Sequence, residues 1–402
     1  MRAIVAAGKA FGRVVAPPSK SMAHRMLIGA GLATGVSRIR NIDLSEDIQA
    51  TLGVLEALGC SYEIDNREVV ITGIGSKKIK TDKALDCKES GSTLRFFIPL
   101  LLAGGEKAVF TGAKRLLERP LDIYKDICEE QEIIFEKSEQ SLTVCGQLKP
   151  AHFRIPGWIS SQFITGLLFA LPLLERDSIV EILPPVESKA YIAMTLEALS
   201  LYGIEIYRRQ DTIYVKANQT YRAYQGEVEG DYSNAAFLEA LNVIGGNVEV
   251  SGLREYSYQG DQVYRNYFNQ IKMGNPILDI SDCPDLGPIL MGLAAAKYGA
   301  TFTGTRRLKI KESDRGTVMA KELAKFGIQV QVEENMIVVN CGELKAPTEK
   351  LESHNDHRIA MSLATLCTLT GGCIEECESV RKSFPGYYDV LGELGISVQI
   401  EE

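Results

Sequence analysis

The chain has few of the features that mark secreted, membrane-spanning or zinc-binding proteins. Its nine cysteines are odd in number and include no C-x-x-C pair, so reduced thiols fit better than a disulfide framework or a cysteine zinc site. No apolar run reaches the length that a bilayer requires. The first residues, Met1 to Val5, already form a strand-like run, with no signal or transit peptide before them. We therefore expect a cytoplasmic protein without membrane contact.

Common catalytic signatures are also absent. There is no P-loop, because Lys20-Ser21 lacks the required glycines, and there is no G-x-S-x-G turn. Gly73-Ile74-Gly75 is only a fragment of a dinucleotide-binding fingerprint. The net charge of −8 argues against a general nucleic-acid binder. Low-complexity tracts and long charge runs are missing, and 402 residues are too many for one core, so two folded domains are expected.

What the sequence does contain is a pattern that occurs six times: an amphipathic helix, a glycine or turn, and two short strands. Clear copies are residues 52–64 and 321–332, the last is 391–400, and the copy at 267–271 is weaker. Most copies are about 70 residues apart, which is longer than the usual solenoid period. The pattern predicts six α/β units in series.

Each unit has a second helix that is apolar on nearly all sides and begins in small polar residues. Such helices are buried in a domain core, so their first turns carry the polar groups. The six starts are 19–21, 89–93, 160–162, 231–234, 282–285 and 355–358. We predict two α/β domains of three βαβαββ-like units, with the helix starts facing a shared cleft. The limits are 1–18 with 229–402, a domain built from both termini, and 19–228, an inserted domain.

Cations gather at these helix starts. Lys20 and Arg25 follow two prolines at the start of the first apolar helix, and a helix N-terminus already favours anions. Lys311 and Arg315 flank Glu312 in a run of five charges in seven residues, although a solvated face is the usual explanation of such a run. Other cations at helix starts or in loops are Arg119, Arg358 and Lys382. The pattern favours a polyanionic small molecule as ligand.

A metal site is an alternative interpretation of one helix start. His354, Asp356 and His357 offer nitrogen and oxygen ligands. Their spacing is not a recognised zinc pattern, and no cysteine or second histidine cluster joins them. We therefore expect no metal there.

Taken in order, the motifs resemble those of the 5-enolpyruvylshikimate-3-phosphate (EPSP) synthase family, the enolpyruvyl transferases of the shikimate pathway. The matching motifs are Pro18-Ser19-Lys20-Ser21, Glu89-Ser90-Gly91-Ser92-Thr93-Leu94-Arg95, Glu118-Arg119-Pro120, Ser160-Ser161-Gln162, Ser188-Lys189-Ala190-Tyr191, Pro284-Asp285, Lys311-Glu312-Ser313-Asp314-Arg315, Asn355-Asp356-His357-Arg358 and Lys382-Ser383-Phe384-Pro385. Their order and spacing fit over essentially the whole chain. The resemblance implies two inside-out α/β domains joined by a hinge, with the active site in the cleft between them. It also implies transfer of the enolpyruvyl group of phosphoenolpyruvate to the 5-hydroxyl of shikimate 3-phosphate, with release of phosphate.

The resemblance also assigns residues to the two substrates. For shikimate 3-phosphate they are Lys20, Ser21, Arg25, Ser160, Ser161, Gln162, Ser188, Tyr191, Asp285 and Lys311. For phosphoenolpyruvate, whose subsite glyphosate occupies in the family, they are Lys20, Gly91, Arg119, Gln162, Arg315, His357, Arg358 and Lys382. Asp285 is implied as the base for the 5-hydroxyl, and Glu312 and Lys20 are implied to move protons at the methylene carbon. No metal or organic cofactor is needed, and a monomer is expected.

Two alternatives remain open at the level of sequence. The sister enzyme that acts on UDP-N-acetylglucosamine uses a loop cysteine, but residues 112–118 contain none, and Cys128 is expected to be a buried structural thiol. A catalytically silent metabolite-binding protein could share the scaffold, but Lys20, Asp285 and Glu312 argue against it. The positions that depart from residues frequent in the family are Glu89, Ser92, Phe96 and Arg307. They leave glyphosate sensitivity and one phosphate contact open.

Overall fold

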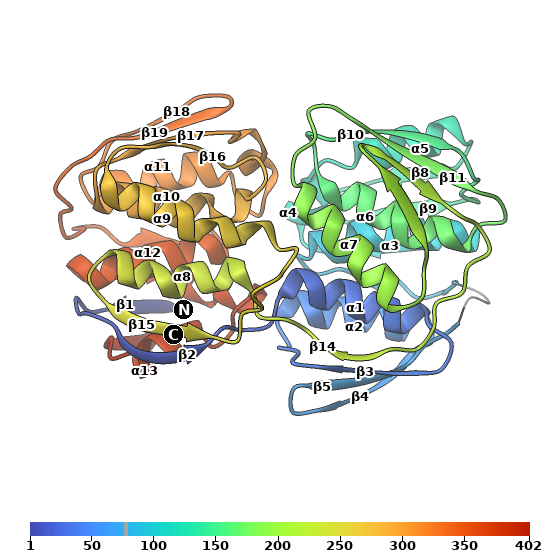
Figure 1. Cartoon of the computed structure of the whole chain (residues 1–402), viewed down its shortest axis with the longest axis horizontal. Helices are drawn as coiled ribbons and strands as arrows, with labels where there is room; N and C mark the ends of the chain where they lie inside the picture. Colours follow the sequence, from blue (N-terminus) through green and yellow to red (C-terminus); the bar gives the residue numbers. More distant parts are fainter. Residues whose placement is uncertain (76–78) are drawn as a thin grey trace. The chain divides into compact units, whose positions relative to one another are not determined.

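The computed structural model describes residues 1–75 and 79–402, and the chain divides into two units (Figure 1). Unit 1 contains Met1–Ser19 and Gly230–Glu402, and unit 2 contains Lys20–Glu229. The bounds differ by one residue from the domain limits expected from the sequence. Each unit has its own hydrophobic core.

Unit 2 has three four-stranded sheets that share one pairing pattern. In spatial order, the first strand is parallel to the second, and the remaining pairs are antiparallel. The sheets are β14 (Gln225–Glu227), β3 (Val36–Arg40), β5 (Glu68–Thr72), β4 (Ser61–Asp65); β6 (Leu85–Asp86), β7 (Ala108–Thr111), β9 (Ser141–Cys145), β8 (Ile134–Lys137); and β10 (His152–Pro156), β11 (Ser178–Leu183), β13 (Thr212–Val215), β12 (Ile206–Arg209). Side chains alternate across each sheet, so one face covers the core, as Leu142 and Val144 of β9 do.

Unit 1 repeats this pairing pattern in two of its three sheets. Its sheets are β16 (Ile277–Asp279), β17 (Ala300–Thr303), β19 (Met336–Val339), β18 (Val330–Val332); β20 (Leu351–Glu352), β21 (Gly372–Glu375), β1 (Arg2–Val5), β22 (Val398–Glu401); and β15 (Asn247–Ser251) with β2 (Phe11–Val15). Strand β1 pairs with both β21 and β22, so the two ends of the chain share one sheet. The two-stranded sheet belongs to the weak sequence copy, whose helix α9 (Tyr264–Met273) is followed directly by β16 without a hairpin.

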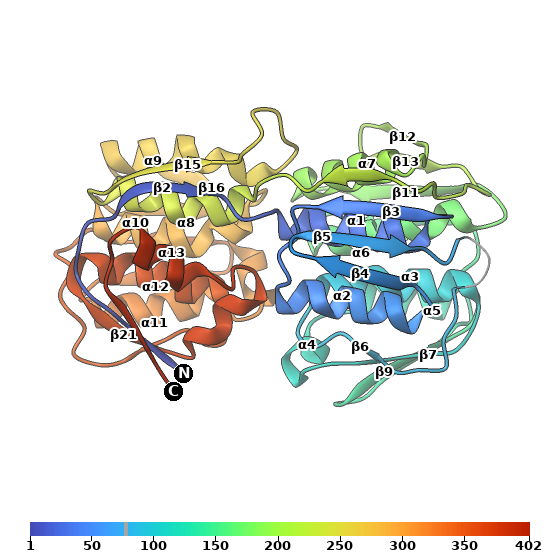
Figure 2. The ribbon, with the colours of Figure 1, turned by 90° about the horizontal axis from the view of Figure 1, so that it is seen from below.

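Three helices lie in the core of each unit, as their all-round apolar sequences predicted (Figure 2). In unit 2 they are α1 (Lys20–Leu32), α3 (Gly91–Gly104) and α6 (Ser161–Ala170). In unit 1 they are α8 (Tyr232–Val243), α10 (Gly287–Ala296) and α12 (His357–Thr370). Several of their polar starts are caps: the side chains of Ser90, Ser160, Asp231 and Asp356 accept backbone N–H groups of the first turns of α3, α6, α8 and α12.

The other helices are more exposed and follow the second strand of each repeat. They are α2 (Glu46–Ala57), α4 (Lys114–Glu118), α5 (Asp122–Glu130), α7 (Lys189–Leu201), α9, α11 (Arg315–Lys325) and α13 (Tyr387–Glu393). Short 3₁₀ helices are η1 (Leu171–Leu173), η2 (Gly260–Val263), η3 (Pro284–Leu286), η4 (Arg306–Ile310) and η5 (Cys377–Lys382). The predicted class is confirmed: the fold is mixed α/β with repeated units around buried helices.

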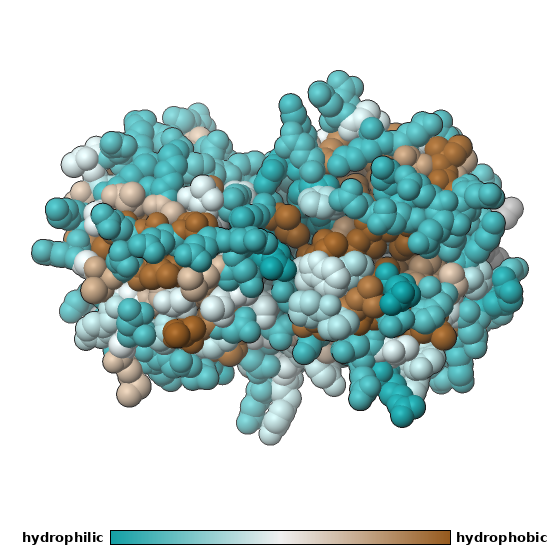
Figure 3. Space-filling view, turned by 90° about the horizontal axis from the view of Figure 1, so that it is seen from above, coloured by the Kyte–Doolittle hydropathy of each residue, from teal (hydrophilic) through white to brown (hydrophobic). Residues whose placement is uncertain are grey.

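Apolar side chains are largely withdrawn into the two cores. On the face shown in Figure 3, polar side chains predominate, and apolar ones are visible between them, mainly along the middle of the view. Within the part of the chain that the structure describes, none of the helices has the length and apolar character that a membrane crossing demands.

Candidate active site

Arg25, in the second turn of α1, is buried and joins its own helix to α7. Its Nε donates to Thr195 Oγ1 at 2.9 Å, its Nη1 to the carbonyl of Ser21 at 2.6 Å, and its Nη2 to the carbonyl of Tyr191 at 3.2 Å. Burial lowers the pKa of Arg25 to about 10, so the side chain still carries its charge at neutral pH. The structure thus brings together three residues predicted to bind shikimate 3-phosphate: Ser21, Arg25 and Tyr191.

Lys20 is the first residue of α1 and forms an ion pair with Asp47 of α2. Its Nζ lies 2.7 Å from Asp47 Oδ2, and the two side chains are only 15% and 11% exposed. The partner follows from local sequence, since Ser45 caps α2 through the N–H of Ile48 and places two carboxylates in its first turn. Lys20 is therefore held in place from the adjacent helix start.

The starts of α3 and α6 meet around the amide of Gln162. Arg95 Nη1 donates to Gln162 Oε1 at 2.7 Å, and Gln162 Nε2 donates to Ser92 Oγ at 3.0 Å. These two contacts define which end of the amide is the acceptor. Arg95 is itself buried and its Nη2 donates to the carbonyl of Pro120 at 3.0 Å, which adds the segment after Arg119 to the same group.

The remaining predicted serines of unit 2 lie at two helix starts. Ser160 and Ser161 are buried at the start of α6, where the Ser160 hydroxyl accepts the N–H of Gln162 at 3.3 Å. Ser188, directly before α7, has a φ of +54°, a left-handed conformation that is uncommon for a serine. It is also fully buried, three residues before Tyr191, whose N–H donates to the Ser188 carbonyl at 3.1 Å.

Gly91, the first residue of α3, lies against the guanidinium of Arg119. A Cβ added to Gly91 would be 2.5 Å from Arg119 Nη1, so only glycine permits this approach without movement of the arginine. Arg119 is 7% exposed, and its Nε has no hydrogen-bond partner among residues 1–75 and 79–402. A buried cation with an unused donor, next to a helix N-terminus, is suited to an anion.

In unit 1, Asp285 of η3 is surrounded by cations. Its Oδ1 accepts from Lys311 Nζ at 2.9 Å and from Arg315 Nη1 at 2.8 Å, and Arg358 Nη2 lies 3.8 Å from Oδ2. Burial alone would raise the pKa of Asp285, but the charges of Lys311, Arg315 and Arg358 outweigh it and hold that pKa well below its usual range. Asp285 is therefore a carboxylate at neutral pH.

Arg315 connects this carboxylate to two others. Its side chain is 1% exposed, its Nε donates to Asp356 Oδ2 at 2.9 Å, and its Nη2 donates to Glu312 Oε2 at 2.8 Å. Burial opposes its charge, but Asp356, Glu312 and Asp285 together raise the pKa of Arg315 well above its ordinary value. The predicted catalytic pair Asp285 and Glu312 thus share one guanidinium.

The first turn of α12 contributes the other predicted residues of unit 1. Arg358 Nη1 donates to Asn234 Oδ1 at 3.4 Å and its guanidinium lies over the ring of Phe237, while His357 is buried beside it in sequence. Lys382 of η5 is 4% exposed and its Nζ donates to the carbonyl of Asn355, directly before α12. Asp285, Lys311, Glu312, Arg315, Arg358 and Lys382 therefore belong to one connected network of unit 1, built around Asp356 and its neighbours.

Other side chains in these networks were assigned no role from the sequence: Asp47, Arg95, Asn234 and Asp261. Asp47 and Asn234 lie in first turns of helices, so a search of the predicted helix starts for polar residues could have found them. Arg95 had been noted only as part of a motif, and Asp261 lies in a loop and short 3₁₀ helix that the pattern of buried helix starts does not cover.

Of the two histidines considered as metal ligands, His354 belongs to a different group of side chains from Asp356. His354 Nε2 lies 3.0 Å from Glu322 Oε1 and 3.6 Å from Glu352 Oε2, whereas Asp356 contacts Arg315. In the described part of the chain, Glu322, Glu352 and His354 are the group with metal-like geometry. Lys325 and Lys321 already pair with the two carboxylates at 2.8 and 3.0 Å, so the charge is balanced without an ion.

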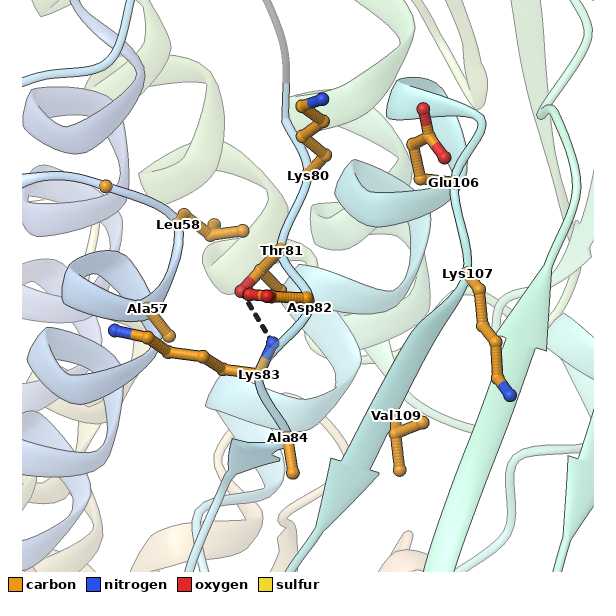
Figure 4. A pocket seen from close by; sticks show the side chains of 11 residues that line it. Ala57, Leu58, Lys80, Thr81, Asp82, Lys83, Ala84, Glu106, Lys107 and Val109 are labelled. Carbon is orange, nitrogen blue, oxygen red and sulfur yellow. Dashed lines mark hydrogen bonds between the residues drawn. The ribbon is translucent and has the colours of Figure 1, made fainter.

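A cavity of about 950 Å³ in unit 2 contains none of the predicted site residues (Figure 4). It lies between the end of α2 near Leu58, residues 80–84, and residues 106–109. Both lysines and acids line it, such as Lys83 and Glu106, and the hydrogen bond drawn in Figure 4 runs from the Lys83 N–H to Thr81 Oγ1 at 3.1 Å. Mixed exposed charges give this cavity no preference for an anion.

The repeated α/β fold carries two cationic networks, and comparison with known proteins identifies its class as that of the enolpyruvyl transferases. A family model described as EPSP synthase (3-phosphoshikimate 1-carboxyvinyltransferase) matches residues 5–391. The chain belongs to the EPSP synthase family. It is therefore an enzyme, and the predicted reaction, an enolpyruvyl transfer of the shikimate pathway, is confirmed.

Individual relatives agree with this assignment. A Clostridium kluyveri protein named 3-phosphoshikimate 1-carboxyvinyltransferase is 40% identical over 413 residues and covers 96% of both chains. A Clostridium perfringens protein of the same name is 38% identical over 418 residues and covers 98% of both. The solved EPSP synthase of Acinetobacter baumannii is 22% identical, covers both chains completely and has a TM-score of 0.80, which shows the shared fold.

The alternative based on a reactive cysteine finds no support in the structure. Cys128 is fully buried in α5, and burial raises the pKa of its thiol to about 12. Such a thiol is protonated and unreactive at neutral pH. The expectation that Cys128 is a buried structural thiol is confirmed.

Proposed function

We propose that this chain adds phosphoenolpyruvate to the 5-hydroxyl of shikimate 3-phosphate through the two networks described above. Ser21, Arg25, Ser160, Ser161, Gln162, Ser188, Tyr191, Asp285 and Lys311 would bind shikimate 3-phosphate. Gly91, Arg119, Gln162, Arg315, His357, Arg358 and Lys382 would bind phosphoenolpyruvate, and Lys20 would contact both. Arginines suit the bidentate recognition of carboxylates and phosphates, and lysines act as point charges.

The observation that carries the proposal is the position of Asp285. Its Oδ1 lies 2.8 to 2.9 Å from two cations, which keeps it ionised but also makes it a weak base. The anionic groups of the substrates would draw Lys311, Arg315 and Arg358 into new contacts. The pKa of Asp285 would then rise toward the working pH, which is what a general base requires. Asp285 would accept the proton of the 5-hydroxyl as its oxygen bonds to C2 of phosphoenolpyruvate.

The other proton transfer occurs at the methylene carbon. As the new C–O bond forms, this carbon takes a proton and a tetrahedral ketal results. Loss of phosphate, and of a proton from the new methyl group, then restores the double bond as an enol ether. We assign this proton traffic to Glu312 and Lys20, which are held by Arg315 and Asp47 respectively.

The cations would also stabilise the second step. Charge develops on the departing phosphate, and preorganised donors that face it lower the barrier most. Arg119, Arg315, Arg358 and Lys382 are all buried, so their charges are poorly screened by water. Every bond formed and broken is accounted for by the two substrates and these side chains, so the proposal needs no further reactant.

Phosphate release from phosphoenolpyruvate tests the proposal. We expect release with shikimate 3-phosphate and none with UDP-N-acetylglucosamine; the opposite preference, or binding without release, would contradict it.

We also propose that the protein is a cytoplasmic monomer, for which light scattering on a sizing column and cell fractionation are the measurements. Arg307 stands where some family members have an asparagine that contacts the shikimate phosphate, so Arg307→Asn in the phosphate-release assay should alter the KM for shikimate 3-phosphate.

A further inference from the structure

Asp261 is a buried carboxyl in unit 1 to which the proposed reaction assigns no role. It lies in η2 and is 4% exposed. The hydroxyl of Ser233, in the first turn of α8, donates to its Oδ2, while its Oδ1 has no hydrogen-bond partner among the described residues. A buried carboxyl with an unused oxygen is costly to keep, particularly when it is ionised.

The start of α8 connects Asp261 to the active-site network. Ser233, which holds Asp261, is followed by Asn234, whose Oδ1 accepts from Arg358 Nη1 at 3.4 Å. Arg358 in turn lies 3.8 Å from Asp285. Asp261 and Arg358 thus contact adjacent residues of one helix start, Ser233 and Asn234, and Arg358 also lies near Asp285.

The charged groups around Asp261 come from η3, α12 and the start of α8. Burial, and next the negative charge of Asp285 from η3, raise the pKa of Asp261 to about 7. The Ser233 hydrogen bond and Arg358 of α12 lower it, and Asp231, the cap of α8, raises it further. Lys311 and Arg315 contact Oδ1 of Asp285, whereas Arg358 lies near its Oδ2. Asp261 therefore changes its charge near neutral pH, whereas Asp285 stays ionised.

We propose that Asp261 is a positioning residue that controls anion binding by Arg358. When Asp261 is uncharged, Asp285 is the negative charge with which an incoming carboxylate or phosphate competes for Arg358. When Asp261 ionises, a second negative charge competes for Arg358 and repels the anion. The interaction is reciprocal, so a bound anion also favours the protonated form of Asp261. The inference rests on the proposed function, because that function places phosphoenolpyruvate on Arg358.

Asp261→Asn tests the inference, since asparagine has nearly the same shape, still accepts from Ser233 and cannot ionise. The readout is the ratio of the KM for phosphoenolpyruvate in wild type to that in the variant, measured from pH 5.5 to 8.5. This ratio removes the titration of the substrate's own phosphate, which is common to both proteins. We expect the ratio to rise by about fivefold to tenfold across the range, with its midpoint near pH 7.

Two further variants separate this role from a structural one. Glu239→Gln removes a carboxylate of α8 that pairs with Arg265. The KM of this variant for phosphoenolpyruvate should show the pH dependence of wild type. Ser233→Ala removes the hydrogen bond that lowers the pKa of Asp261, so its KM should begin to rise at a higher pH than in wild type. The serine variant also keeps the test available if Asp261→Asn does not fold.

The outcomes distinguish the inference from the function. If Asp261→Asn retains the pH dependence of wild type, or if Ser233→Ala does not move it upward, the positioning role is wrong while the enolpyruvyl transfer stands. If wild type releases no phosphate at any pH with shikimate 3-phosphate, the proposed function itself fails.

Discussion

At the scale of single residues, Asp285 combines two properties that conflict in a free carboxylate. It is ionised because Lys311, Arg315 and Arg358 surround it, and those same cations weaken it as a base. In the proposed mechanism, substrate anions that compete for the cations would resolve the conflict, so that Asp285 would become a stronger base only when both substrates are bound.

Asp285→Asn tests this account directly. The variant should keep its affinity for shikimate 3-phosphate within about tenfold, and its turnover should fall by ~10²–10⁴, the usual contribution of a positioned acid–base group. Calorimetric titration and the phosphate-release assay measure the two quantities. The exposed Glu334→Gln in the same unit is the matched control and should be unchanged. Near-normal turnover of Asp285→Asn would remove this residue from the mechanism.

Gly91→Ala probes the contact with Arg119. The added methyl would lie 2.5 Å from the end of a flexible side chain, so the fold should persist while the guanidinium moves. We expect weaker binding of both phosphoenolpyruvate and glyphosate, with the larger loss for glyphosate, measured as KM and inhibition constant. Gly53→Ala on α2, where a Cβ meets nothing within 4 Å, is the control. Unchanged inhibition by glyphosate would place Gly91 outside the subsite.

The sequence predicted the polar role of residues that lie in a recognisable local pattern. Lys20, Gly91, Glu312 and Arg358 are all at or near helix starts, so their polar role could be inferred from neighbours in the chain. Asp261 could not, because its significance comes from Ser233 and Arg358 of other elements. The sequence does not distinguish the carboxyl of Asp261 from a solvent-exposed one; only its burial in the structure does.

At the scale of elements, the buried helices of unit 2 are joined by a chain of hydroxyls. His24 Nδ1 of α1 lies 2.8 Å from Thr51 Oγ1 of α2, and Thr51 lies 2.8 Å from Thr93 Oγ1 of α3. Thr93 donates to Ser90 Oγ at 2.7 Å, so Thr51 donates to Thr93 and His24 Nδ1 donates to Thr51. The network assigns the tautomer of His24 and aligns the helix starts that carry Lys20 and Gly91.

This network predicts acid sensitivity. Burial, then the charges of Lys20 and Arg25, lower the pKa of His24 well below its ordinary value of 6.5. The unfolded chain therefore binds a proton that the folded chain excludes, and stability is lost as the pH falls below about 6.5. We expect a loss approaching about 1.4 kcal/mol per pH unit from this group, measured by denaturant unfolding between pH 6.5 and 5.

His24→Gln should lessen that slope, whatever it does to stability at pH 8. His152→Gln, on β10, is the comparison for the loss of an exposed histidine, because 53% of the His152 side chain is exposed. Equal slopes for wild type and His24→Gln would show that His24 takes up its proton without unfolding the network.

Elements differ in how far local sequence defines them. The six repeats and the all-round apolar helices were predictable, since each depends on a period of a few residues. The pairing of β2 with β15 and of β14 with β3 was not, because partners such as Phe11 and Asn247 are joined only by tertiary contacts. The sequence indicated that no hairpin follows α9 only through the weakness of the copy at 267–271.

At the scale of the whole molecule, residues assigned to one pair of substrates are divided between two units. Arg25, Gly91 and Arg119 belong to unit 2, whereas Lys311, Arg315 and Arg358 belong to unit 1. The proposed reaction therefore requires ligands that engage both units. Like charges without an anion repel one another, and an anion favours the arrangement in which it contacts the most cations.

Small-angle scattering tests this requirement. Shikimate 3-phosphate and glyphosate together supply anions for both sets of cations, so they should lower the radius of gyration, and closure would exclude water from the reacting groups. Glyphosate alone should leave the radius unchanged, because the subsite for phosphoenolpyruvate would then lack its neighbouring ligand. Inorganic phosphate at the same ionic strength controls for screening. Identical scattering curves for the free and the doubly liganded protein would contradict ligand-driven closure, while the chemistry assigned to Asp285 would still be tested separately by its own variant.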